Sequence, residues 1–154
     1  MSSAFPYANL RFDDLKAGDL YPIGSYTMTR AEVLAFASKY DPQPYHLDDA
    51  AAEASPIFGR LSASGWHTAM IMNLLLDRFW KSTQVRGLAG GGIDNLRWIK
   101  PVYPDDVITG ELEIVLARAS QSKPDRGVMT MRVVMRNQHN EPVAEVTMTG
   151  MMQR

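Results

Sequence analysis

Two residues of the sequence combine side chains suited to proton transfer with a spacing that limits their relative position. Asp41 and His46 begin and end the segment "DPQPYH" (41–46), which has prolines at two of its positions. An imidazole titrates near neutral pH, and a neighbouring carboxylate can orient the ring or a water molecule. In an extended segment the two Cα atoms would lie about 15 Å apart, at about 3.1 Å per residue. The segment must therefore bend to bring the two groups together, and each proline fixes a backbone angle of that bend.

The same pattern has simpler interpretations. A helix that ends at Asp and Pro is a common stop signal, so the spacing alone favours a turn with a surface histidine. His46 and Asp48 are also metal-ligand types, but no third ligand of a suitable type lies nearby, which argues against a metal site. The chain has no cysteine, so disulfides and thiolate chemistry are excluded.

A glycine at the start of a predicted helix supplies a second chemical feature. The helix "WHTAMIMNLLLDRFW" (66–80) is apolar on nearly every side, which predicts that it is buried. Ser64 is a candidate N-cap, and the free N–H groups of the first turn carry the positive end of the helix dipole. A carbonyl placed at Gly65 would be polarised there, and the absent side chain lets it approach the backbone. Together with the acid–base pair, this predicts proton addition or removal beside a carbonyl.

The elements that must position these groups are a few helices followed by strands. Thr29 and Glu32 form a capping box for a helix that ends at about Tyr40, because Pro42 disfavours helical geometry at the residue before it. A short helix is predicted over 47–55 and a loop over 56–65. Further along, "GGG" (90–92) is interpreted as a flexible entry to the next strand. Alternating apolar residues predict extended segments over 20–29, 95–103, 105–120, 128–138 and 142–153.

This order predicts an α+β fold. One apolar central helix needs cover on most of its circumference, and a curved antiparallel sheet supplies it. We therefore predict a single domain over 1–154, with an irregular segment at 1–19 and a core over about 20–152. Because such a sheet leaves open edges, and pairing the edges of two copies protects them, we also expect a homodimer.

Composition and charge argue against several other classes of function. The chain is 45% hydrophobic and 21% charged, as in ordinary globular proteins. Its formal net charge of -1, from 16 Lys+Arg and 17 Asp+Glu, gives no general attraction to nucleic acid or to a membrane surface. The start of the sequence lacks a signal-peptide pattern, and the longest apolar-rich stretch is too short to span a bilayer. We expect a cytoplasmic protein with no nucleic-acid or membrane partner.

The stretch from about Thr29 to Asp77 resembles the MaoC-like dehydratases, hot-dog-fold proteins that include the (R)-specific enoyl-CoA hydratases. Their signature D-x-N-P-x-H corresponds here to "DPQPYH" (41–46), and their later F…I-A-H-G segment corresponds to Phe58 and "LSASG" (61–65). The passage "LRWIKPVYPDDVITGELEI" (96–114) is similar to the family's strand–P-V–turn–D–strand passage. In all, the resemblance covers roughly residues 20 to 150.

The resemblance implies a hot-dog enzyme that reversibly hydrates a 2-enoyl-CoA to a 3-hydroxyacyl-CoA, with acyl-CoA as its substrate and no cofactor. Asp41 and His46 would hold and activate one water, and the Gly65 N–H would polarise the thioester carbonyl. Asn73 takes the place of a helix serine that often assists in the family's hydratases. Further substrate contacts are expected from Ser64, Phe58 and Trp66.

Two positions depart from the family pattern, although neither removes the acid–base pair. Gln43 replaces the asparagine of the motif, and Ser64 replaces the histidine before the glycine. Two alternative functions remain open: an acyl-CoA thioesterase on the same fold, and a non-catalytic acyl-CoA-binding or assembly module. His67 is interpreted as structural. Four cations, although most simply interpreted as surface charges, are candidates to meet the CoA phosphates: Lys81, Arg86, Arg97 and Lys100.

Overall fold

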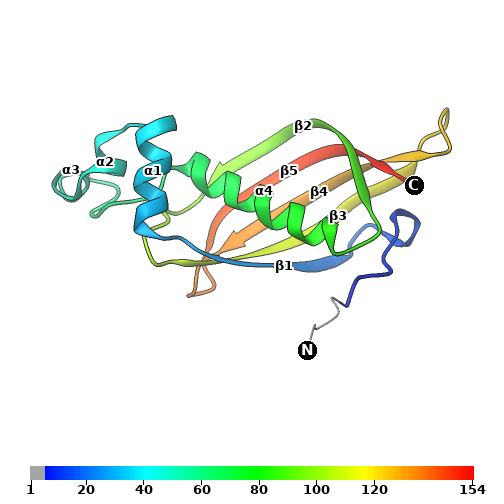
Figure 1. Cartoon of the computed structure of the whole chain (residues 1–154), viewed down its shortest axis with the longest axis horizontal. Coiled ribbons are helices and arrows are strands. Elements are labelled where there is room, and N and C mark those ends of the chain that lie inside the picture. The colour runs from blue at the N-terminus through cyan, green and yellow to red at the C-terminus, as the bar shows by residue number, and fades with distance from the viewer. Residues whose placement is uncertain (1–5) are drawn as a thin grey trace.

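The chain forms a curved antiparallel sheet wrapped around one long helix (Figure 1), as described by a computed structural model of residues 6–154. The sheet order is β1-β3-β4-β5-β2, so β1 and β2 are its two edges. The predicted α+β fold, with the sheet around a central helix, is confirmed. The strands are β1 (Leu20–Thr27), β2 (Arg86–Trp98), β3 (Val107–Ala119), β4 (Arg126–Arg136) and β5 (Pro142–Gln153).

Helix α4 (Gly65–Lys81) lies along the concave face of the sheet, as Figure 1 shows. Its buried residues share one hydrophobic core with the inward side chains of the strands, and full burial of each such side chain contributes about 1.5–3 kcal/mol. The cover is incomplete, however, because Trp66 and Met70 remain 53% and 51% exposed. The helix is therefore buried on its sheet side, and the prediction of burial on nearly every side was wrong for this stripe.

Three further helices gather beside the start of α4 (Figure 1): α1 (Arg30–Tyr40), α2 (Pro44–Leu47) and α3 (Asp49–Glu53). At the start of α1, the Thr29 hydroxyl accepts a hydrogen bond from the Glu32 N–H at 3.3 Å. The Glu32 carboxylate in turn accepts hydrogen bonds from the hydroxyls of Thr29 and Tyr26. The helix ends at Tyr40 as predicted. No helix within residues 6–154 is long and apolar enough to cross a membrane.

The glycine run belongs to a strand, contrary to its interpretation as a flexible entry. It lies in the middle of β2, which pairs with β5 through three register shifts. Bulges of this kind interrupt the regular alternation from which a strand is recognised in a sequence. Glycine suits the run physically, because Gly92 has φ +152 and a Cβ at Gly91 would lie 3.0 Å from the Thr149 carbonyl oxygen.

The predicted irregular segment before β1 contains one short element. A 3-10 helix, η1 (Phe12–Asp14), buries Phe12 against the core. The part of this prediction that concerns residues 1–5 lies outside the described residues.

Candidate active site

The segment between Asp41 and His46 bends as a tight turn followed by one turn of helix. Asp41 is the C-cap residue of α1, and its carbonyl accepts a hydrogen bond from the Gln43 N–H at 2.7 Å. Pro44 is the first residue of α2, a position where its missing N–H costs no hydrogen bond. The Gln43 side chain caps nothing, so backbone bonds hold the turn. The bend places His46 Nε2 3.6 Å from Asp41 Oδ2.

A contact with the backbone of Ser62 determines which nitrogen of the neutral His46 ring carries the hydrogen. His46 Nδ1 lies 2.7 Å from the carbonyl oxygen of Ser62. A carbonyl only accepts, so Nδ1 carries the hydrogen, and in the neutral ring the Nε2 lone pair is directed toward Asp41. The imidazole is 5% exposed. Sequence reasoning missed Ser62, because its main chain makes this contact and no residue type signals it.

Ser64 connects the carboxylate to the start of the central helix. Its hydroxyl donates to Asp41 Oδ2 at 2.6 Å and accepts from the Trp66 N–H at 3.2 Å. The predicted N-cap role is confirmed by the second bond. The first bond was not predicted. It fixes the Asp41 carboxylate beside the helix N-terminus, and Ser64 itself is fully buried.

Gly65, Asp41 and His46 line one pocket of about 400 Å³. Gly65 is the first residue of α4, where N–H groups have no intrahelical acceptor. A Cβ there would lie 2.6 Å from Cε2 and Nε1 of Trp98, so any other residue would force this indole to move. The other lining residues are mostly apolar and include Lys100 as a cation. They are Tyr45, Ile57, Phe58, Ala63, Trp66, Thr68, Trp98, Ile99, Lys100, Pro101, Val102 and Val143.

Only some of the predicted substrate-binding residues line this pocket. Phe58 and Trp66 line the pocket, and Phe58 stacks on Tyr45 with ring centroids 4.8 Å apart. Asn73 is exposed and lines a different pocket, between α4 and the strands β2 and β5. It lies eight residues beyond Gly65 along α4, a rise of about 12 Å, which is why it is absent from the first pocket.

His67 lies outside the pocket lining, on the side of α4 that α1 covers. Its ring stacks on Phe36 with centroids 4.8 Å apart and planes 6° from parallel. Within residues 6–154 its buried Nδ1 has no hydrogen-bond partner. Burial lowers the pKa of His67, and the Glu32 carboxylate opposes this shift. The neutral ring is therefore the form that suits this contact between helices.

Nothing among the described residues resembles a metal centre. Within 6–154 there is no group of three or more His, Asp or Glu side chains that could hold an ion. Asp48, considered above as a ligand, caps α3 by accepting a hydrogen bond from the Ala51 N–H at 2.8 Å.

Comparison with known proteins gives consistent matches along the chain. The model of the MaoC-like domain family matches residues 18–145. A MaoC-like dehydratase from Rhodospirillum rubrum is 35% identical, with a TM-score of 0.80 over 92% of this chain and 95% of that one. The (R)-hydratase from A. caviae involved in PHA biosynthesis is 26% identical, with a TM-score of 0.67 over 88% and 95%. The uncharacterized protein YdeM of Bacillus subtilis (strain 168) is 25% identical over 146 residues, which are 94% of this chain and 100% of YdeM.

Proposed function

The chain belongs to the MaoC-like domain family and has its hot-dog fold, and we propose that it reversibly hydrates a 2-enoyl-CoA to a 3-hydroxyacyl-CoA. One observation carries the proposal: His46 Nε2 lies 3.6 Å from Asp41 Oδ2, on a pocket that Gly65 also lines. The similarity to an (R)-hydratase supports the same reaction class.

Two acceptors at this separation suit one water molecule, which has two hydrogens to donate. In the proposed reaction the water donates one hydrogen bond to His46 Nε2 and one to Asp41 Oδ2. As the water oxygen bonds to C3 of the enoyl group, His46 accepts the proton and becomes an imidazolium, which the Asp41 carboxylate stabilises. The imidazolium then returns a proton to C2, so that one water is added in total and the catalyst is unchanged.

The negative charge that develops on the thioester oxygen needs its own donor. The N–H of Gly65 is suited to this task, because it lies at the positive end of α4 and has no intrahelical acceptor. The apolar walls of the pocket strengthen such a hydrogen bond by excluding water. No cofactor takes part in the proposed reaction.

The direct test is the hydration of crotonyl-CoA, followed as the loss of enoyl absorbance. We expect activity in the wild type, and a fall in kcat of about 10²–10⁴-fold for Asp41→Asn and for His46→Gln, since the first removes the charge that stabilises the imidazolium and the second removes the proton acceptor. Binding of the unreactive butyryl-CoA should change much less, which separates chemistry from folding. Wild-type protein that is inactive on short and medium enoyl-CoAs would contradict the proposal.

Parallel measurements separate the two alternatives. Release of free CoA thiol from an acyl-CoA would indicate a thioesterase. Binding of acyl-CoA that survives Asp41→Asn combined with His46→Gln, without any turnover by the wild type, would indicate a binding or assembly module.

The proposal includes assembly as a homodimer. It is supported by the open edge strand β2, in which Leu88 and Ile93 are 47% and 62% exposed. Two copies paired through this edge would protect unpaired backbone groups that otherwise face solvent.

A further inference from the structure

The proposed substrate ends in phosphates, and the structure distinguishes among the cations that are candidates to meet them. Lys81 and Arg86 line the other pocket, between α4 and β2. Arg97 is on the edge strand and lines neither of these two pockets. Within residues 6–154, Lys100 is the one lysine or arginine that lines the pocket with Asp41 and His46.

The backbone of Lys100 is fixed where the chain leaves the sheet. The N–H groups of Ile99 and Lys100 both donate to the carbonyl oxygen of Val143, at 2.8 and 3.2 Å. Pro101 follows and restricts the next backbone angle. The Lys100 side chain is 47% exposed, so this lining residue of the pocket is also partly in solvent.

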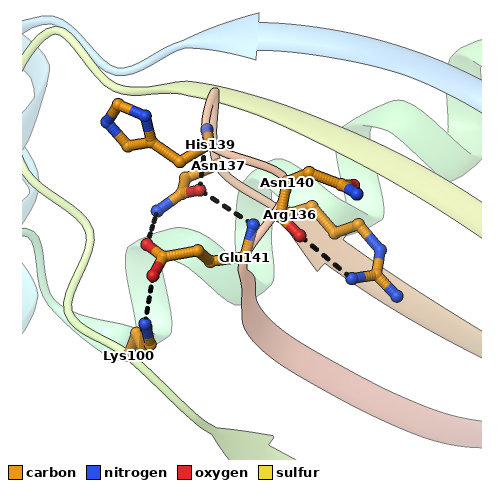
Figure 2. Close-up of polar contacts among 6 residues, drawn as sticks. All are labelled: Lys100, Arg136, Asn137, His139, Asn140 and Glu141. Carbon is orange, nitrogen blue, oxygen red and sulfur yellow. Dashed lines mark hydrogen bonds and ion pairs between the residues drawn. The ribbon is translucent and has the colours of Figure 1, made fainter.

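The ammonium is also held in place, by a carboxylate that is itself anchored. Lys100 Nζ donates to Glu141 Oε1, and Glu141 Oε2 accepts from Asn137 Nδ2 at 2.9 Å (Figure 2). The Asn137 side-chain oxygen accepts from the Glu141 N–H at 3.1 Å, which closes the β4–β5 turn. The hydrogen bond from Asn137 and the pairing with Lys100 lower the pKa of Glu141, so this residue stays ionised.

From this arrangement we infer that Lys100 is a specificity residue of the proposed hydratase, which binds a phosphate on the arm of the thioester substrate. An ammonium has three N–H donors, and the pairing with Glu141 uses one of them. Glu141 acts as a positioning residue, because its ion pair restricts the flexible four-carbon side chain of a residue that lines the pocket. The inference rests on the proposed function for the identity of the substrate.

Three crotonyl thioesters test the inference, because they share the same acyl-pantetheine arm and extend it in steps: pantetheine has no phosphate, 4′-phosphopantetheine adds one phosphate, and CoA adds the rest of the phosphorylated nucleotide. Lys100→Met keeps an unbranched side chain, one atom shorter, and removes its charge. We expect KM for crotonyl-CoA to rise at least about 10-fold, the low end of the effect of one hydrogen bond to a charged group. We expect kcat to stay within about twofold, and KM for the pantetheine ester, which lacks phosphate, to stay unchanged. Lys100→Arg should restore most of the loss.

The smallest thioester for which Lys100→Met raises KM identifies the phosphate that Lys100 contacts. A loss already present with phosphopantetheine indicates the phosphate that free CoA and carrier-bound substrates share. A loss with CoA alone indicates the nucleotide end. Lys81→Met is the matched control, because Lys81 also pairs with a carboxylate, Asp77 at 2.8 Å, but lies on the other pocket.

An equal rise in KM for all three esters, or no rise for CoA, would overturn the inference and leave the proposed reaction intact. If the wild type hydrates none of them, the proposed reaction fails instead. The affinities for butyryl-CoA and butyryl-pantetheine, compared between wild type and Lys100→Met, then still test the contact with phosphate.

Discussion

Among single residues, Ser64 shows how a departure from a family pattern can be accommodated. It stands where the resemblance expects a histidine, yet its hydroxyl bonds both the Asp41 carboxylate and the N–H of Trp66. One small side chain thus caps the helix and orients the proposed catalytic acid–base pair. Because Ser64 is fully buried, the much larger side chain of a histidine would need additional space at this position.

Ser64→Ala should therefore separate activity from binding. We expect kcat for crotonyl-CoA to fall about 10-fold, because the Asp41 carboxylate loses a donor that orients it, while KM changes little. Loss of the cap should lower the free energy of unfolding by about 1 kcal/mol, measured in urea. Ser64→Thr retains the hydroxyl and should recover activity. An Ala variant with unchanged kcat would remove Ser64 from the positioning of Asp41.

The proximity of Asp41 and His46 depends on a local bend that the two prolines indicate, although the spacing alone favoured a turn with a surface histidine and the family resemblance was needed to expect a pair. Five residues separate Asp41 from His46, and two prolines restrict the path between them. The contacts of Ser62 and Lys100 are not local in this sense. The first is a backbone carbonyl 16 residues from His46, and the second depends on Glu141, 41 residues away. Such contacts arise from the three-dimensional arrangement of the loop and strands, which residue types do not encode directly.

At the scale of elements, regular patterns were read correctly and irregular ones were not. The cap at Thr29 and the stop at Tyr40 follow from side-chain hydrogen bonds and proline sterics, which act within a few residues. By contrast, β2 carries three register shifts and a glycine run, so it lacks the alternation that marks a strand. Its place at the edge also leaves most of its side chains exposed on both faces.

The contact between α1 and α4 predicts how stability depends on pH. Burial lowers the folded-state pKa of His67 below its ordinary value of 6.5. The unfolded chain therefore binds a proton first as the pH falls, so stability is fully present above about pH 7.5 and declines through 6.5 toward the folded pKa. His67→Phe, which keeps a ring on Phe36, should flatten this part of the curve by up to about 1.4 kcal/mol per pH unit.

Urea unfolding of both proteins between pH 7.5 and 5 measures the difference directly. Glu32 faces His67, but its pKa is lowered below its ordinary value of 4.5 by the hydroxyls of Thr29 and Tyr26, so it stays ionised over this range and the comparison isolates His67. Replacement of the exposed His139 by Asn serves as the control and should leave the slope close to that of the wild type. If the free energy of unfolding varied with pH in the same way for wild type and His67→Phe, the folded-state pKa of His67 would not be lowered by burial.

For the molecule as a whole, the two sheet edges differ in how they meet solvent. Strand β1 has eight residues, and α4 packs against it from the concave side. Strand β2 has thirteen residues, nearly all exposed, and its end at Trp98 forms part of the pocket. A long open edge of this kind is a template for pairing with another chain. Pairing of β2 with β2 of a second copy would be two-fold symmetric and closed.

This asymmetry makes the homodimer testable with two matched substitutions. Ile93→Lys places a charge on the exposed side of β2, and Leu20→Lys does the same on β1, where Leu20 is 58% exposed. Light scattering after size exclusion should give the wild type and Leu20→Lys twice the chain mass of 17.2 kDa. Ile93→Lys should elute as a monomer, because burying an unpaired charge in an interface is unfavourable. A wild type that is monomeric at all concentrations would contradict the proposed assembly, whereas a dimer lost only in Leu20→Lys would place it on the other edge.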